Sequence, residues 1–96
     1  MVTVWTTQAI TELKKAFEYI SQDSTQNANH VIDEITSLAD QLAQHPEMFP
    51  PDKFKTDNDG SWRAFEKFNY RISYRIAKDN IRILRMRHTK RSPLHY

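Results

Sequence analysis

The chain has no cysteine, which excludes disulfide bonds and thiolate-bound zinc and is typical of a protein from a reducing compartment. It also has no apolar run near the roughly 20 residues that a membrane-spanning helix requires. Met1 is followed by Val-Thr-Val-Trp rather than by the basic segment that opens a signal peptide. We therefore expect a cytoplasmic protein that does not enter a membrane.

Carboxylates are missing from the last seventeen residues, Asn80 to Tyr96, which carry five lysines and arginines. Residues 1–50 hold two lysines against seven carboxylates, whereas residues 51–96 hold twelve lysines and arginines against five. The net charge of +2 thus conceals an acidic half and a basic half. Such a basic surface is typical of a protein that contacts phosphate or an acidic polypeptide, although a solvated charged strand is the simpler interpretation.

Metal-binding patterns are also absent, because the four histidines His30, His45, His88 and His95 lie far apart in sequence and lack the spacing of zinc ligands. We expect neither a metal nor a cofactor. Ninety-six residues suffice for one domain with a single core but not for separate substrate and cofactor domains. We therefore expect residues 1–96 to form one domain with a shallow functional surface.

Two segments of the first half carry apolar residues three and four positions apart, the spacing of an amphipathic helix. The first extends from Gln8 to about Gln22, after a Thr6-Thr7 pair that can cap it, and the second ends at His45-Pro46. Because the turn between them is short, we expect the helices to lie antiparallel as a hairpin.

Four segments have strand patterns: residues 2–5, 62–68, 70–77 and 81–88. Residues 46–60, which include the only glycine, are expected to be an ordered loop that lines a site or simply packs on the surface. Strict alternation in the last strand places Leu84, Met86 and His88 on one face and Ile81, Ile83, Arg85 and Arg87 on the other, so this strand should be central. The predicted fold is α+β, in the order β-α-α-β-β-β, with the helical hairpin on one face of a small, mostly antiparallel sheet.

These segments, in this order, resemble the RelE/ParE superfamily of toxins from bacterial type II toxin–antitoxin systems. The resemblance covers the whole chain and is carried by Leu42…His45-Pro46, Trp62-Arg63, Tyr70-Arg71-Ile72-Ser73-Tyr74-Arg75 and the segment from Ile81 to His88. It implies the β-α-α-β-β-β fold and inhibition of growth. It leaves two activities open, because RelE-like and YoeB-like members cleave mRNA on the ribosome, whereas ParE-like members inhibit DNA gyrase without nuclease chemistry.

The resemblance to RelE-like enzymes assigns catalytic roles to particular residues. Arg71 matches the arginine that these enzymes place beside the scissile phosphate, where a guanidinium can bind two phosphate oxygens. The alternative is that Arg71 pairs with a carboxylate on a neighbouring strand. Arg63 matches the position of a catalytic lysine, whereas Phe65 occupies the position of another, a departure that weakens the nuclease interpretation.

The tail carries further candidates. By spacing, Lys90 or Arg91 and Tyr96 match the arginine and tyrosine that RelE-like enzymes use after the last strand, and the phenol could transfer a proton or stack on a base. Tyr96 is the final residue, and chain ends fray unless they dock. His88 matches the ParE-like pattern, in which a histidine ends the last strand, and is either a general base or a structural cap.

The residues therefore favour a metal-independent mRNA endonuclease that acts on the ribosome, with a ParE-like inhibitor of DNA gyrase as the alternative. A generic nucleic-acid-binding domain is disfavoured, because most aromatic residues occupy predicted core positions rather than a stacking surface. Either toxin interpretation implies a cognate antitoxin, expected to be an acidic segment that folds on binding and wraps the basic sheet.

Overall fold

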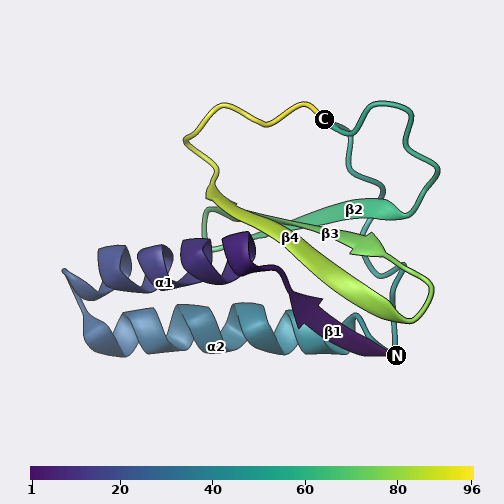
Figure 1. The fold of residues 1–96 in the computed structure, drawn as a ribbon. Helices are drawn as coiled ribbons and strands as arrows, with labels where there is room; N and C mark the ends of the chain where they lie inside the picture. Colours follow the sequence, from purple (N-terminus) through teal and green to yellow (C-terminus); the bar gives the residue numbers. More distant parts are fainter.

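The computed structural model describes residues 1–96 and confirms the predicted α+β fold, with two antiparallel helices packed against one face of a four-stranded sheet (Figure 1). The elements are β1 (Val2–Trp5), α1 (Thr7–Ser21), α2 (Thr25–Gln41), β2 (Trp62–Lys67), β3 (Tyr70–Ile76) and β4 (Asn80–His88). Neither helix is both long and apolar enough to cross a membrane.

Side-chain caps fix where the helices begin. The hydroxyl of Thr6 accepts a hydrogen bond from the Ala9 amide at 3.1 Å, and the hydroxyl of Ser24 accepts one from the Asn27 amide at 3.0 Å, which satisfies otherwise free donors of the first turn. The predicted end of the second helix was too late. The last turn of α2 tightens into bonds between residues three apart, such as that from the Leu42 amide to the Ala39 carbonyl, so the helix ends at Gln41 before Pro46 can stop it.

The strands lie in the order β1-β4-β3-β2, with β1 parallel to β4 and the other two pairs antiparallel. β4 is therefore central, as predicted. The β2–β3 hairpin closes through Phe68 and Asn69, which have φ values of 52° and 67°, the left-handed conformation of a two-residue hairpin turn. β2 consequently ends at Lys67, one residue earlier than expected.

A β-bulge changes the side-chain pattern of β4. Ser73 of β3 lies opposite Arg85, but the next residue, Tyr74, lies opposite Ile83, so Leu84 is an extra residue in β4. An extra residue in one strand reverses the alternation beyond it. The predicted faces of the last strand were therefore wrong.

The bulge brings Met86 onto the same buried face as Ile81 and Ile83, where all three are at most 2% exposed. Arg85 and Arg87 are moved to the opposite, outer face, where they line a cavity. Without the extra residue, two arginines would point into the core and Met86 would point to solvent. The bulge thus gives the sheet an apolar face toward the helices and a basic outer face.

Candidate functional site

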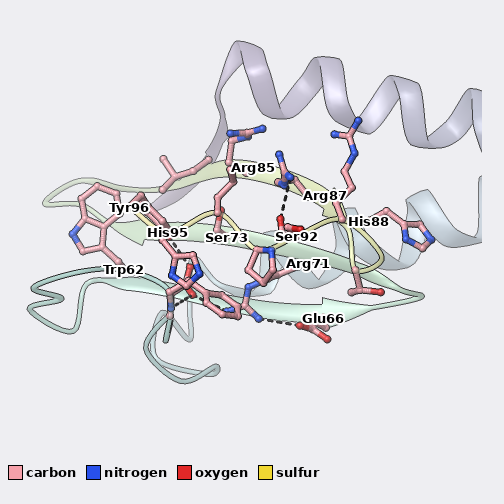
Figure 2. Close-up of a pocket in the computed structure, with 17 residues that line it drawn as sticks. Trp62, Glu66, Arg71, Ser73, Arg85, Arg87, His88, Ser92, His95 and Tyr96 are labelled. Atoms are coloured by element: carbon pink, nitrogen blue, oxygen red, sulfur yellow. Dashed lines mark hydrogen bonds and ion pairs between the residues drawn. The ribbon is translucent and has the colours of Figure 1, made fainter.

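The residues after β4 cross the outer face of the sheet and end against the loop that follows α2 (Figure 1). Together the tail, the loop and strands β2 to β4 enclose a cavity of about 450 Å³ (Figure 2). The sequence left open whether the loop of residues 46–60 lines a site or only packs on the surface. It lines the cavity, through Asp52 and Phe54.

The tail is docked rather than frayed. The Tyr96 amide donates to the Phe54 carbonyl at 3.1 Å, and the Thr56 amide donates back to the Tyr96 carbonyl. The Tyr96 ring makes an edge contact with Trp62 at a centroid distance of 5.8 Å. These contacts hold the end of the chain in place, where chain ends otherwise fray.

Asp52 lies at the centre of the contacts between tail, loop and sheet. Its side chain is 2% exposed and accepts hydrogen bonds from the Tyr96 hydroxyl at 2.6 Å, the Arg71 guanidinium at 2.7 Å and the Phe54 amide at 3.0 Å. Burial by itself raises the pKa of this carboxyl, but the three donors outweigh burial, so the pKa of Asp52 is lowered. Asp52 is therefore a buried carboxylate that connects three segments of the chain.

Arg71 has both ends of its guanidinium occupied. Nη2 pairs with Asp52, and Nη1 pairs with Glu66 at 3.0 Å on the neighbouring strand β2. The guanidinium also lies over the Phe54 ring, 4.8 Å from its centroid. The structure thus has the arrangement that the sequence left open as the alternative, in which Arg71 pairs with a carboxylate of the next strand.

The Tyr96 phenol is held in its neutral form. Burial raises the pKa of Tyr96 well above its ordinary value, and the hydrogen bond to the Asp52 carboxylate and the negative charge of that group raise it further. Because the hydroxyl proton is directed at Asp52, the phenol donates to a protein carboxylate. This geometry leaves it poorly suited to accept a proton from a substrate.

The other predicted tail residues lie toward the end of β4. His88 lines the cavity, stacks its ring edge against Tyr70 at 5.1 Å and accepts a hydrogen bond at Nδ1 from the Lys90 amide at 3.0 Å. The Lys90 side chain does not line the cavity, whereas Arg91 does. The structure therefore brings together Arg71, His88, Arg91 and Tyr96 around one cavity but leaves out Lys90.

Arg63 is separated from this group. It lies opposite the buried Tyr74 in the β2–β3 ladder, on the face away from the cavity. Its Nε donates to the Gly60 carbonyl at 2.8 Å and its Nη1 to the Phe49 carbonyl at 2.7 Å. The prediction that Arg63 belongs to the phosphate site is therefore corrected. Neighbouring residues of a strand point to opposite faces of the sheet, and Arg63 lies on the face away from the cavity, where its side chain anchors the loop.

Two residues of the site, Asp52 and Glu66, were not identified from the sequence. Asp52 lies in a proline-rich loop in which an aspartate ordinarily indicates a turn, and only the unusual length of that loop suggested a role. No three histidine, aspartate or glutamate side chains lie close enough together to hold a metal ion.

The lowered pKa of Asp52 gives a pH-dependent stability that can be measured. An unperturbed aspartate titrates near 3.8, and a folded-state pKa below the unfolded one adds stability that is present above about pH 4 and is lost as the pH falls through the folded-state value. We expect the stability difference between wild type and Asp52→Asn to be constant from about pH 7 to about pH 5 and to shrink below about pH 4. Urea unfolding across this range tests it, and a difference that stays constant at about pH 2 would contradict it.

Comparisons with known proteins agree with this fold. A solved structure described as the chromosomal ParDE TA system from P. aeruginosa superimposes with a TM-score of 0.72, covering 92% of this chain and 95% of that one at 18% sequence identity. No curated protein matches the sequence. A family profile described as "ParE toxin of type II toxin-antitoxin system, parDE" matches residues 3–93.

The protein is thus a toxin of a type II toxin–antitoxin system, and the chain belongs to the ParE toxin family. The predicted membership of the RelE/ParE superfamily is confirmed. Membership also implies an antitoxin as its partner.

Proposed function

We propose that this toxin acts without catalysis, by binding and inhibiting DNA gyrase. The observation that carries the proposal is the occupancy of Arg71, whose guanidinium is bound by Asp52 and by Glu66. RNA cleavage needs cations that are free to bind the phosphate as its oxygens gain charge. An arginine that already has two carboxylate partners would have to break its ion pair with the buried Asp52 to do so.

Tyr96 supports the same proposal. RNA cleavage also needs a base for the 2′-hydroxyl and an acid for the leaving oxygen, and the Tyr96 hydroxyl is bonded to Asp52 with its pKa raised. The position of Arg63 on the other sheet face removes a further candidate cation. Ribosome-dependent mRNA cleavage, which the sequence favoured, therefore has little support from the geometry.

The proposal predicts opposite outcomes in two assays. Purified toxin should inhibit ATP-dependent supercoiling of relaxed plasmid by gyrase and should leave mRNA on programmed ribosomes intact, because the Arg71 guanidinium and the Tyr96 hydroxyl are both bound to Asp52. Toxin premixed with its antitoxin is the control and should restore supercoiling. Cleavage of mRNA together with unaffected gyrase would overturn the proposal and assign the protein to the nuclease branch.

The antitoxin is proposed to be acidic where it meets the outer face of the sheet. Several arginines of this face have no carboxylate within ion-pair distance in the toxin alone, and glutamates or aspartates of a partner would neutralise them. A cytoplasmic location is part of the same proposal, since gyrase acts on the chromosome.

A further inference from the structure

Four arginines of the outer face and tail form a row of unpaired charge. Every ion pair of the structure involves either Arg71 or Arg85. The remaining arginines on this side are Arg75, Arg82, Arg87 and Arg91, and we call them the arginine row. The only hydrogen bond from the Arg87 side chain goes to a neutral acceptor, the Ser92 carbonyl at 3.2 Å, so its charge is not neutralised.

Two of these arginines face each other across neighbouring strands. Arg75 of β3 is directly opposite Arg82 of β4, and like charges in such a position repel. Arg71 and Arg87 face each other in the same way, but the two carboxylates bound to Arg71 offset the repulsion between them. The Arg75–Arg82 pair has no such partner, which indicates a place for an external anion.

The charged groups around Arg75 do not change this conclusion. The carboxylate of Asp59 is near enough to feel the Arg75 charge, but it forms no ion pair with it and accepts hydrogen bonds from Ser61 instead, at 2.6 Å from the hydroxyl and 2.9 Å from the amide. Lys55 is also close, because its ammonium lies over the Trp62 ring at 4.8 Å. The surroundings of the pair are therefore basic.

Arg75 is also oriented by its surroundings. Its guanidinium lies over the Trp62 ring, 4.4 Å from the centroid, and its Nε is buried without a hydrogen-bond partner. Stacking on an aromatic ring fixes the plane of an arginine and leaves its edge available for an oxygen ligand. The buried Nε is closed to an external ligand, whereas the terminal nitrogens of Arg75 are not buried and have no hydrogen-bond partner, so an external oxygen would bind there.

The length of the arginine row favours a polyanion as its ligand. Arg82 and Arg87 lie five residues apart on one strand, which separates them by about 17 Å. The one indole on this face, Trp62, already carries Lys55 and Arg75, and the Tyr96 ring is fixed against the loop. Single-stranded nucleic acids need free aromatic surface for their bases, whereas a duplex offers only phosphates to a face of this kind.

We propose that the arginine row binds the phosphate backbone of duplex DNA, without reading its sequence. This inference rests on the toxin's own geometry and goes beyond the proposed inhibition of gyrase. If the toxin acts on gyrase, the duplex that the arginine row contacts would be the DNA bound by gyrase. Binding of DNA by the toxin alone is measurable whether or not gyrase is inhibited, so the two proposals can fail separately.

The test is the salt dependence of binding to a fluorescent duplex, measured by anisotropy between about 50 and about 200 mM salt. Wild-type toxin should bind, and the double variant Arg75→Gln, Arg82→Gln should bind more weakly, with the slope of log K against log salt reduced by about 2, about one for each lost phosphate contact. The matched control is Lys14→Gln, Lys15→Gln, which removes the same charge from the exposed side of α1 and should leave the slope unchanged.

Three results would overturn the proposal. The first is the absence of DNA binding by wild-type toxin, and the second is an equal change of slope in the arginine variant and in the lysine control. The third is tighter binding of single-stranded RNA than of the duplex, with the arginine variant weakened for RNA, which would identify RNA as the ligand; an acidic antitoxin is expected to compete with the duplex for the same arginines. Circular dichroism confirms the fold of each variant. If Arg75→Gln, Arg82→Gln does not fold, the single variant Arg82→Gln, at an exposed position, should reduce the slope by about 1.

Discussion

Replacing Asp52 with alanine is expected to lower the free energy of unfolding by about 3 to 5 kcal/mol, the usual cost of removing one partner from a buried ion pair. The Asp52 side chain is 2% exposed and receives three donors, from Arg71, Tyr96 and the Phe54 amide. Without it, the Phe54 amide and the Tyr96 hydroxyl lose their acceptor, and Arg71 keeps only the half-exposed Glu66. Urea unfolding followed by circular dichroism measures the loss.

The same substitution should also release the tail. Tyr96 is held to the loop by its backbone bonds to Phe54 and Thr56 and by its hydroxyl on Asp52, so loss of Asp52 should expose the last residues to carboxypeptidase. Asp52→Asn is the matched control, because an amide of the same shape keeps an acceptor for the Phe54 amide while removing the charge, and should cost less than alanine. A change of stability below about 1 kcal/mol in Asp52→Ala would contradict the central role of this carboxylate.

Replacing Glu12 with alanine is expected to cost about 2 to 3 kcal/mol, because Glu12 completes the sheet where β1 ends. β1 pairs with β4 only as far as Ile83, and beyond that point α1 lies beside the free edge. Glu12 accepts the Met86 amide at 2.9 Å and binds the Arg85 guanidinium through both carboxylate oxygens, at 2.9 to 3.2 Å. A helix side chain thus replaces the missing strand partner at the β-bulge.

Two variants separate the parts of this contact. Glu12→Gln keeps an acceptor for the Met86 amide and should cost about half as much as Glu12→Ala, since only the charge toward Arg85 is lost. Glu18→Ala, at an exposed position of the same helix, should change stability by less than about 0.5 kcal/mol. Thermal unfolding of the three variants tests the order, and equal losses in Glu12→Gln and Glu12→Ala would show that the amide contact contributes nothing.

The elements and their order could be predicted from the sequence because they depend on local patterns. Apolar spacing of three and four residues specifies α1 and α2, and strict alternation specifies β3, since each periodicity produces one apolar face. The predicted central position of β4 was correct, although the reasoning was not: the bulge gathers Ile81, Ile83 and Met86 on one face. The RelE/ParE superfamily could be recognised for the same reason as the elements, since the matching segments are the helices and strands themselves.

The candidate site could be predicted only in part. Arg71, His88, Arg91 and Tyr96 were identified from their positions in the chain, and the structure brings them to one cavity. Whether an arginine is free to bind phosphate depends on its partners, and those of Arg71 come from 19 and 5 residues away along the chain. The sequence shows that both carboxylates are present, but not that they lie next to Arg71.

The sequence by itself determined the α+β fold, the helical hairpin, the basic second half and the toxin superfamily, because local periodicity and charge are properties of neighbouring residues. The tertiary structure decided which face each arginine occupies and which charges neutralise one another. One extra residue at Leu84 reverses the faces of β4, and one carboxylate from the loop binds Arg71 and Tyr96. Both depend on contacts between segments distant in sequence, and the strength of an ion pair depends on a distance that only the folded chain defines.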